Sequence, residues 1–283
     1  MLDEPLHLRS APELRSVEQF LRTRIDNAIQ QMRAESVEQG LTLWKLYNHG
    51  WVVKTPRHAW AYDLYEGWGR ASMSERQIDA ILAQVQALFC SHWHGDHTSV
   101  MVLKRALALN KPVFVSPGPE GEWGAPLQAE IFNGLTDAVE KRGITVVEPD
   151  SSGEAGDGVI FYAYPGHQGR LENNVFAVSA DGLCVVHTGD QFSEEDFAWI
   201  DKAAEHRAVD VLLPNVWTLD LPRMIRGFSL RVVVPGHENE LGHAFEHREP
   251  YDQAYELLNE ESVRWHVMAW GERLHVGGGK KGP

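Results

Sequence analysis

The sequence contains few cysteines: Cys90 and Cys184 are the only two in 283 residues. Each lies in an apolar, strand-like run, and neither has a partner at CxxC spacing. A disulfide framework is therefore not expected, which fits the reducing cytoplasm. We expect both thiols to be buried and inert, because free cysteine is among the most buried residue types. Cys90 lies two residues before His92, so support of a nearby site is the alternative.

Basic residues are also scarce, with 26 Lys and Arg against 40 Asp and Glu and a net charge of −14. A general nucleic-acid partner is not expected, because phosphate contacts need a basic surface. No apolar run is long enough to span a membrane, and the first residues have no signal-peptide pattern. We expect a cytoplasmic protein that acts on a small molecule. Whether it forms a homo-oligomer is left open.

No low-complexity linker or short repeat divides the chain, and 43% of the residues are hydrophobic. We predict one main domain over residues 41–276. Residues 1–40 are predicted to be a loose arm over 1–12 and then an amphipathic helix over 17–38, ended by Gly40, that packs on this domain. Residues 277–283 are predicted to be a flexible tail.

Within the main domain, alternating β-formers and turn residues predict an antiparallel meander over 41–64 and a hairpin over 174–187. Ser74 is a candidate cap for a helix over 74–82. Helices are also predicted over 99–109, 127–141, 193–205 and 249–261. The segment 117–125 is rich in Gly and Pro, and its Trp123 either covers a site or simply packs.

Four of the seven residues from Ser91 to His97 are potential metal ligands: His92, His94, Asp96 and His97. They follow a predicted buried strand over 87–90 and precede the helix over 99–109. Open α/β folds carry reactive groups in the crevice beyond the carboxyl ends of their strands. Alternate residues of an extended loop share a face, so His92 and His94 point the same way. Such a dense set of donors has little structural rationale and predicts a metal site.

Three more candidate ligands follow later apolar runs, each beside a glycine: His167, Asp190 and His237. Imidazole and carboxylate donors suit zinc, iron or manganese. We predict two divalent ions, with zinc preferred, that together activate a water molecule, polarise the substrate and stabilise a leaving group. The predicted first set is His92, His94 and His167, the second is Asp96, His97 and His237, and Asp190 lies between them.

The run His92-Trp93-His94-Gly95-Asp96-His97 resembles the H-x-H-x-D-H signature of the metallo-β-lactamase superfamily. His167 in Tyr-Pro-Gly-His, Asp190 in Thr-Gly-Asp and His237 in Pro-Gly-His are similar to the later motifs of that family, in the same order. The resemblance spans about residues 40–245. It implies a four-layer αβ/βα sandwich of the α/β (α+β) class, with a dinuclear metal site at one edge.

Two positions narrow what the resemblance implies. Position 190 is Asp, where many true β-lactamases of this fold carry Cys, so the site is similar to those of glyoxalase II, RNase Z and lactonases. Position 94 is His, where the di-iron flavoprotein branch carries Glu. The expected activity is hydrolysis of a carboxylic ester, lactone, thioester or phosphodiester, not of an antibiotic. The alternatives are a mono-iron oxidoreductase similar to the persulfide dioxygenases and a non-catalytic binding module, which the complete ligand set disfavours.

Several residues near these motifs have candidate supporting or catalytic roles. Asp63 and His187 both lie in apolar runs. Each either makes structural hydrogen bonds in the core or supports the metal ligands. Asp96 is expected to orient the attacking water while it binds metal. His243 either protonates a leaving group, contacts a phosphate or only packs. Ordinary packing or solvation is the alternative for the candidate substrate contacts, which are Asn215, Trp217, Arg170, Arg223 and Arg226.

Overall fold

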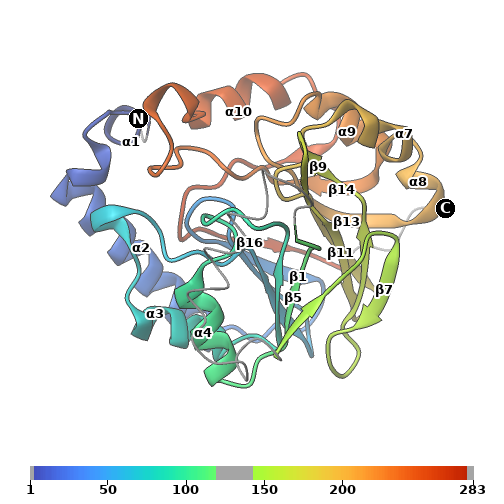
Figure 1. Ribbon diagram of the computed structural model, residues 1–283, viewed down its shortest axis with the longest axis horizontal. Helices are drawn as coiled ribbons and strands as arrows, with labels where there is room; N and C mark the ends of the chain where they lie inside the picture. The colour runs from blue at the N-terminus through green and yellow to red at the C-terminus, as the bar shows by residue number, and fades with distance from the viewer. Residues whose placement is uncertain (1–2, 119–142, 279–283) are drawn as a thin grey trace.

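The computed structural model describes residues 3–118 and 143–278, which form two seven-stranded sheets (Figure 1). The predicted helix over 127–141 and Trp123 lie outside the described residues. The first sheet has the order β16 (Arg273–Val276), β1 (Leu41–Lys45), β2 (Trp51–Lys54), β3 (Ala59–Tyr62), β4 (Ala87–Cys90), β5 (Val113–Val115) and β6 (Ile144–Val146). The second has the order β15 (Arg264–Trp265), β14 (Ser229–Val233), β13 (Ala208–Leu213), β12 (Leu183–His187), β11 (Val175–Ala180), β8 (Ile160–Tyr164) and β7 (Ser151–Glu154). A separate hairpin pairs β9 (His167–Gln168) with β10 (Leu171–Glu172).

Strands β1 to β5 of the first sheet are buried on both faces, and alternate residues pack in different layers. Leu43 and Trp60 belong to the core between the two sheets, whereas their neighbours Trp44 and Ala61 face the outer helices. The ring of Phe89 lies at the centre of the inner core, against aromatic rings from both sheets. The strongly apolar runs that predicted these strands are therefore explained by burial on two faces.

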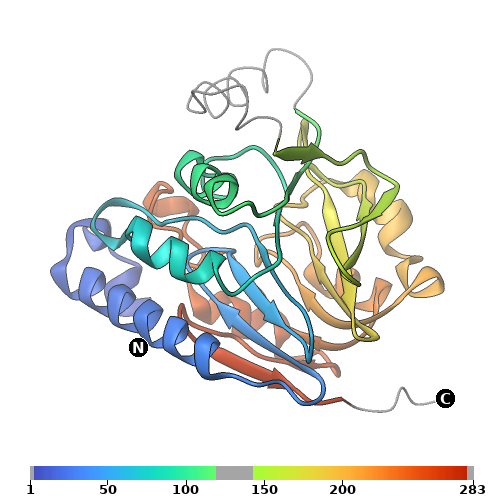
Figure 2. The same cartoon turned by 90° about the horizontal axis from the view of Figure 1, so that it is seen from below.

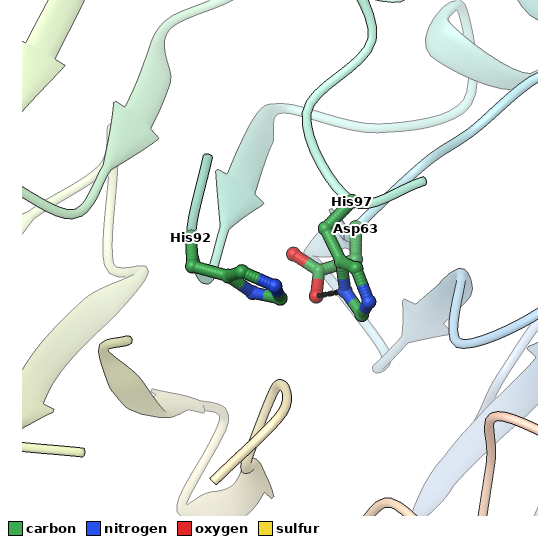
Figure 3. A group of neighbouring side chains, drawn as sticks. All are labelled: Asp63, His92 and His97. Carbon is green, nitrogen blue, oxygen red and sulfur yellow. Dashed lines mark hydrogen bonds and ion pairs between the residues drawn. The ribbon is translucent and has the colours of Figure 1, made fainter. Parts of the chain in front are cut away.

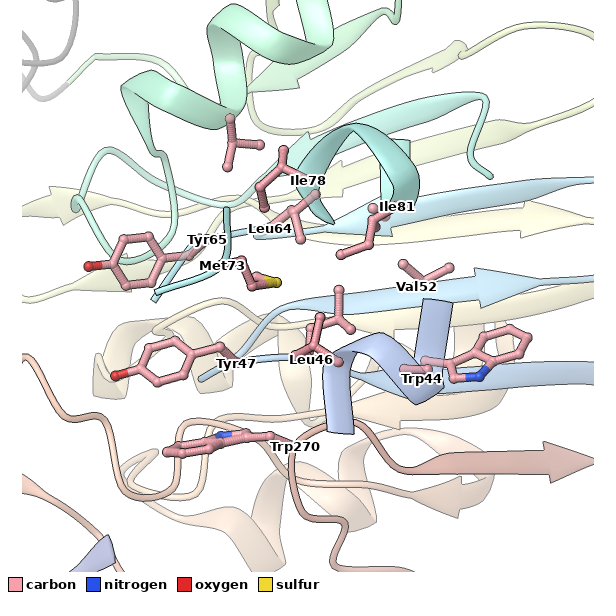
Figure 4. Packing of buried hydrophobic residues seen from close by; sticks show 14 of the residues in the cluster. Trp44, Leu46, Tyr47, Val52, Leu64, Tyr65, Met73, Ile78, Ile81 and Trp270 are labelled. Carbon is pink, nitrogen blue, oxygen red and sulfur yellow. The ribbon is translucent and has the colours of Figure 1, made fainter. Parts of the chain in front are cut away.

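Helices cover the outer face of each sheet and complete the four layers predicted from the resemblance (Figure 2). Figure 4 shows the packing beneath α2 and α3, where Trp44, Leu46 and Val52 contact residues of the helices. The helices of this side are α1 (Asp3–Leu6), η1 (Ala11–Glu13), α2 (Arg15–Ala34), η2 (Gly69–Ala71), α3 (Glu75–Leu82) and α4 (Val100–Ala108). Those nearer the second sheet are η3 (Glu194–Asp196), α7 (Phe197–Ile200), α8 (Ala203–His206), α9 (Leu221–Gly227), η4 (Phe245–His247) and α10 (Tyr251–Leu258).

The N-terminal segment differs from the loose arm that was predicted. Leu6 and Ala11 are buried, and the Asp3 carboxylate accepts hydrogen bonds from the Asn239 side chain at 2.9 Å and the Tyr251 backbone at 2.7 Å. The sequence pattern missed this because the partners are more than 230 residues away. The helix that follows also ends at Ala34, before Gly40, since the chain becomes extended there and buries Val37.

The single helix predicted over 193–205 is instead divided into η3, α7 and α8. Asp196, the last acid of the run from Glu194 to Asp196, is 2% exposed. Its carboxylate accepts hydrogen bonds from the backbone and the ring of His167, and this inward orientation interrupts the helix. Among the helices in the described ranges, none has both the length and the hydropathy needed to cross a membrane.

The candidate ligands gather at one edge of the sandwich because several strands end there. β3 runs parallel to β4, and β12, β13 and β14 run parallel to one another. The carboxyl ends of parallel strands meet at the same edge of a sheet. Asp63 follows β3, the His92 loop follows β4, Asp190 lies just beyond β12, and His237 lies beyond β14.

Candidate metal centre

Overlapping groups of potential ligands lie at this edge, with donor atoms within 4.8 Å of one another in each group. Ring nitrogens of His92 and His94 are 2.9 Å apart. Burial lowers the pKa of both residues, which favours the neutral imidazole that metal ions require. The three groups around Asp190 and Asp96 are His92, His94 and Asp190; His97, Asp190 and His237; and Asp96, His237 and His243.

Asp190 belongs to two of these groups. Its Oδ2 lies 3.6 Å from Nε2 of His92, and its Oδ1 lies 3.2 Å from Nε2 of His97 and 3.4 Å from Nε2 of His237. Both oxygens are buried and accept no hydrogen bond within the described part of the chain. A carboxylate shared by two cations needs both oxygens free of other donors and other ligands on either side. The bridging role of Asp190 itself stays a prediction.

Asp96 lies on the more open side of the centre. Its Oδ2 is 3.4 Å from Nε2 of His97, 3.5 Å from Nε2 of His237 and 3.7 Å from Nε2 of His243. The side-chain amide of Asn48 donates a hydrogen bond to the same oxygen at 3.1 Å. Asp96 therefore has a fixed orientation, and the centre brings His243 close to the predicted ligands.

The electrostatics of the cluster show that its carboxylates need positive charge opposite them. Burial opposes the charged form of His237, but Asp190 and Asp96 outweigh this effect and raise its pKa to about 10. Burial likewise opposes ionisation of Asp190, yet His97 and His237 hold its pKa well below the ordinary range. Divalent cations would supply this positive charge in place of the imidazole protons. The orphaned buried atoms of Asp190, His97 and His237 fit such ions.

His167 is the one predicted ligand that the described groups do not include. It lies on β9, and its Nδ1 is 2.7 Å from the buried carboxylate of Asp196. Metal-binding histidines commonly donate their second ring N–H to a carboxylate in this way. This bond directs Nε2 of His167 away from Asp196, and its ligation of the first ion stays a prediction.

Asp63 supports the His92 loop through hydrogen bonds, which is one of the two roles predicted from its place in an apolar run. Figure 3 shows its carboxylate joined to Nδ1 of His97, at 2.6 Å, with His92 beside the pair. The carboxylate also accepts hydrogen bonds from the backbone and the hydroxyl of Ser91, at 2.7 and 2.6 Å. Asp63 thus holds both ends of the His92 loop and directs Nε2 of His97 toward Asp190.

The loop that carries Asp190 is held by its own set of polar residues. The backbone N–H of Gly189 donates to Nδ1 of His187, and Nε2 of His187 lies 3.1 Å from the His49 carbonyl. His187 therefore has the buried, supporting place predicted as one of its alternatives. The side-chain amide of Asn215 donates to the carbonyls of Gly189 and Gln191 and so holds the same loop, and its contact with substrate stays a prediction.

Sequence reasoning missed several supporting residues in the turn between β1 and β2. Asn48 and His49 lie in this turn, and both are fully buried at the centre. Gly236 packs directly against the His49 ring, so no side chain fits at that position. The meander contained a usable signal: β1 and β3 point the same way, so the turn after β1 lies at the edge where β3 ends.

A buried ion pair beside His237 was also missed. Lys45 and Glu238 have fully buried side chains, and the Lys45 ammonium donates hydrogen bonds to Glu238 and to the Pro235 carbonyl. Burial lowers the pKa of Lys45 and raises that of Glu238, so the pairing only partly offsets desolvation. The pair joins the end of β1 to the segment that carries His237.

No protein-family model matches the sequence, and no curated protein matches it. Solved structures do match. Igni18, a metallo hydrolase from Ignicoccus hospitalis, is 18% identical, with a TM-score of 0.61 over 83% of this chain and 97% of that one. YhfI from Bacillus subtilis, a metallo-β-lactamase fold protein, is 11% identical, with a TM-score of 0.58 over 84% of this chain and 100% of that one.

This chain has the metallo-β-lactamase fold. The same fold occurs in CmlA, a diiron β-hydroxylase from Streptomyces venezuelae, which is 14% identical, with a TM-score of 0.55. That match covers 86% of this chain but 55% of CmlA. The metallo-β-lactamase fold therefore accounts for the two sheets and the edge that carries the ligands, while solved examples carry out more than one kind of chemistry.

Two cavities open beside the centre of this metallo-β-lactamase fold, and His243 lines both. The larger, of about 660 Å³, is also lined by Asp96, and the smaller measures about 470 Å³. Trp217 lines the smaller cavity, as predicted for a substrate contact, and its ring lies 5.4 Å from that of Phe192 and 5.5 Å from that of His237. Both volumes are in the range of small-molecule sites.

The predicted anion-binding arginines do not reach these cavities. Arg170 is exposed and is not among the described lining residues of either one. Arg223 pairs with Asp201 and Glu194 on the surface, and Arg226 lies near Glu261. The exposed position of Arg170 agrees with its alternative as a solvated surface charge, and its contact with substrate stays a prediction.

Proposed function

We propose that this protein is a cytoplasmic metal-dependent hydrolase that cleaves an ester-type bond in a small molecule. One observation carries the proposal: Asp190, buried and without a hydrogen-bond donor in the described ranges, lies between His92 on one side and His97 and His237 on the other. A buried carboxylate without a donor is unfavourable unless cations are bound. The metallo hydrolase among the matching structures supports the same chemistry.

The chain offers a donor set for two divalent cations, which we take to be zinc, with iron and manganese as alternatives. His92, His94 and His167 would hold the first, Asp96, His97 and His237 the second, and Asp190 both. When bound, such ions lower the pKa of a water molecule and polarise the bond to be cleaved.

The other steps belong to side chains of this protein. Asp96, fixed by the Asn48 amide, would orient the attacking water. Asp63 holds the Nδ1 proton of His97 and so keeps its Nε2 pointed at Asp190. His243, whose Nε2 lies 3.7 Å from Asp96 and which lines both cavities, would donate a proton to the leaving group.

Replacing His92 and His94 together by Ala tests the proposal. We expect the double variant to lose tightly bound metal, measured by elemental analysis of protein purified without added metal, and to lose hydrolysis of an ester and phosphodiester panel. His206→Ala, at an exposed site, is the matched control and should keep both. Full metal retention in the double variant would contradict the ligand assignment, and inactivity of the wild-type protein on the whole panel would favour a binding module.

A second candidate is a mono-iron oxidoreductase. The match to a diiron β-hydroxylase of the same fold supports oxidative chemistry on this scaffold but not a single iron. Metal stoichiometry separates the two functions. One iron per chain together with oxygen uptake would establish the oxidoreductase, whereas two ions per chain and no oxygen uptake would reject it.

A further inference from the structure

The larger cavity beside the centre has mainly aromatic and apolar walls. Tyr65, Trp68, Trp93 and Met101 all line it. Trp93 is fully buried, and its indole N–H donates to the carbonyls of Ser116 and Pro117, so its polar atom is already satisfied. Trp68 is 51% exposed, and contact of so large an apolar side chain with water is unfavourable. The walls therefore suit an apolar group that covers Trp68.

The charged residues of the same cavity do not form an anion site. Lys104 is the one Lys or Arg among its described lining residues, and Glu66 and Glu240 line it too. Recognition of phosphate or carboxylate commonly uses the planar guanidinium of Arg, and Arg223 is held in surface ion pairs. A phosphodiester or a carboxylate-bearing arm would lie against carboxyl groups with a single ammonium group to balance it.

The reacting bond has a defined place relative to both cavities. His243 lines both, and Asp96 lines the larger, so both cavities open at the side of the centre that carries these two residues. The smaller cavity is lined by Phe192 and Trp217, whose rings are tilted against each other. A substrate that fills both cavities would have one arm in each, with its scissile bond beside His243.

We propose that the substrate is an uncharged carboxylic ester, thioester or lactone with an apolar arm that occupies the cavity of Tyr65, Trp68, Trp93 and Met101. This rests on the hydrolase function proposed above. Water adds to the acyl carbon, the bond from that carbon to the leaving oxygen or sulfur breaks, and the leaving group takes up a proton. The products are a carboxylic acid and an alcohol or thiol, or a single hydroxy acid where the substrate is a lactone.

A series of 4-nitrophenyl esters tests this substrate class on the metal-loaded protein. From acetate through butyrate to octanoate, kcat/KM should rise by up to about fourfold for each CH₂ group that enters the cavity. It should exceed kcat/KM for bis(4-nitrophenyl) phosphate throughout. Equal values along the ester series, or preference for the phosphodiester, would overturn the inference while leaving the hydrolase function in place.

Two variants locate the apolar arm. Trp68→Ala should lower kcat/KM for the octanoate ester at least tenfold and change that for acetate by less than about twofold, because acetate is too short to reach this wall. Tyr255→Ala removes an equally exposed aromatic ring that lines neither cavity and should leave both values unchanged. An equal loss on both esters in Trp68→Ala would contradict the assignment.

Binding without turnover separates this inference from the hydrolase function. The ketone 2-decanone resembles an apolar ester but has no bond to hydrolyse. Calorimetry should show that it binds the metal-loaded protein more tightly than the short ketone 2-butanone does, and that Trp68→Ala weakens it. Such binding with no ester hydrolysis would uphold the cavity and reject the hydrolase. Equal binding of the two ketones, or binding of 2-decanone independent of Trp68, would reject the cavity assignment.

Discussion

At the scale of single residues, buried carboxylates determine how the imidazoles of the centre are oriented. Asp63 holds His97, Asp196 holds His167, and each carboxylate contacts the ring nitrogen opposite the one available for a cation. Such partners fix the tautomer and direction of a ligand, and their loss commonly costs 10–100-fold in metal affinity. The centre is therefore formed by the ligands together with the acids behind them.

His243 is the residue whose role most needs a separate test, because its position near Asp96 and His237 suits either a proton donor or a ligand. We expect His243→Ala to keep its bound metal and to lose about 10²–10⁴-fold in kcat, the usual contribution of a general acid. Elemental analysis and steady-state kinetics measure the two properties.

His247→Ala is the matched control for His243→Ala, because His247 lines the smaller cavity without belonging to any of the described ligand groups. It should retain metal and most of kcat. Loss of one ion per chain in His243→Ala would show instead that His243 is a ligand.

Whether the role of a residue could be predicted from the sequence depended on how far away its partners lie along the chain. Ligands in a dense loop could be found from spacing alone, as His92 and His94 were. Asn48 and Asp196 could not, because a turn Asn and one acid in an acidic run look like ordinary surface residues until their distant partners are known.

At the scale of elements, the Lys45–Glu238 pair connects β1 to the segment after β14. Lys45→Met leaves a buried carboxylate without its partner, which typically costs about 3–5 kcal/mol of unfolding free energy. Chemical denaturation measures this loss, and chelator competition should show weaker metal binding as the His237 segment loosens.

The double variant Lys45→Met/Glu238→Leu serves as the control for that experiment, because it removes both charges. Replacement of a buried ion pair by apolar residues is often neutral. We expect it to recover most of the lost stability and metal affinity. If Lys45→Met alone were as stable as the wild-type protein, the pair would have no part in holding the segment.

Among the elements, those with strong local signals were predicted well. The meander, the β11–β12 hairpin and α3 with its Ser74 cap follow from alternation, turn residues and capping, all of which are local. The predicted helix over 193–205 was wrong, because the inward turn of Asp196 outweighs helix propensity. The strands β7, β9 and β10 were missed, being short and mostly not fully buried.

At the scale of the whole molecule, Asp181 joins the two sheets through their β2–β3 and β11–β12 turns. Burial opposes its ionisation, but hydrogen bonds from Thr55, the backbone and side chain of Arg57, and His58 outweigh this and lower its pKa. A carboxylate whose pKa is depressed in the folded protein stabilises the fold at pH values above its pKa in the unfolded chain, which is near 4. This stabilisation is lost as the pH falls below that value.

Asp181→Asn removes this charge and keeps a residue that tolerates the positive φ of 52°. At pH 7 we expect the variant to be about 1.5–3 kcal/mol less stable, the usual range for hydrogen bonds to a charged group. The difference from the wild-type protein should shrink as the pH is lowered from 5 toward 2. Denaturation curves across this range measure it, and a difference independent of pH would contradict the charge-based account.

The four-layer architecture could be predicted because the motif order resembles that of a known fold, which strand alternation alone does not specify. The attachment of the N-terminal segment could not, since Asp3 meets Asn239 and Tyr251 only in the folded chain. The cavities likewise depend on the packing of Trp68, Trp93 and His243 from separate loops.

The donors of the centre are encoded far apart along the polypeptide, which affects when the protein can acquire its ions. While the chain is being translated, an ion that reaches it meets only the loop 92–97 until His167, Asp190 and finally His237 leave the ribosome. The two sheets must also pack against each other before these residues come together. The proposed centre is therefore completed after translation of residue 237, and the nascent chain has only an open, exchangeable site.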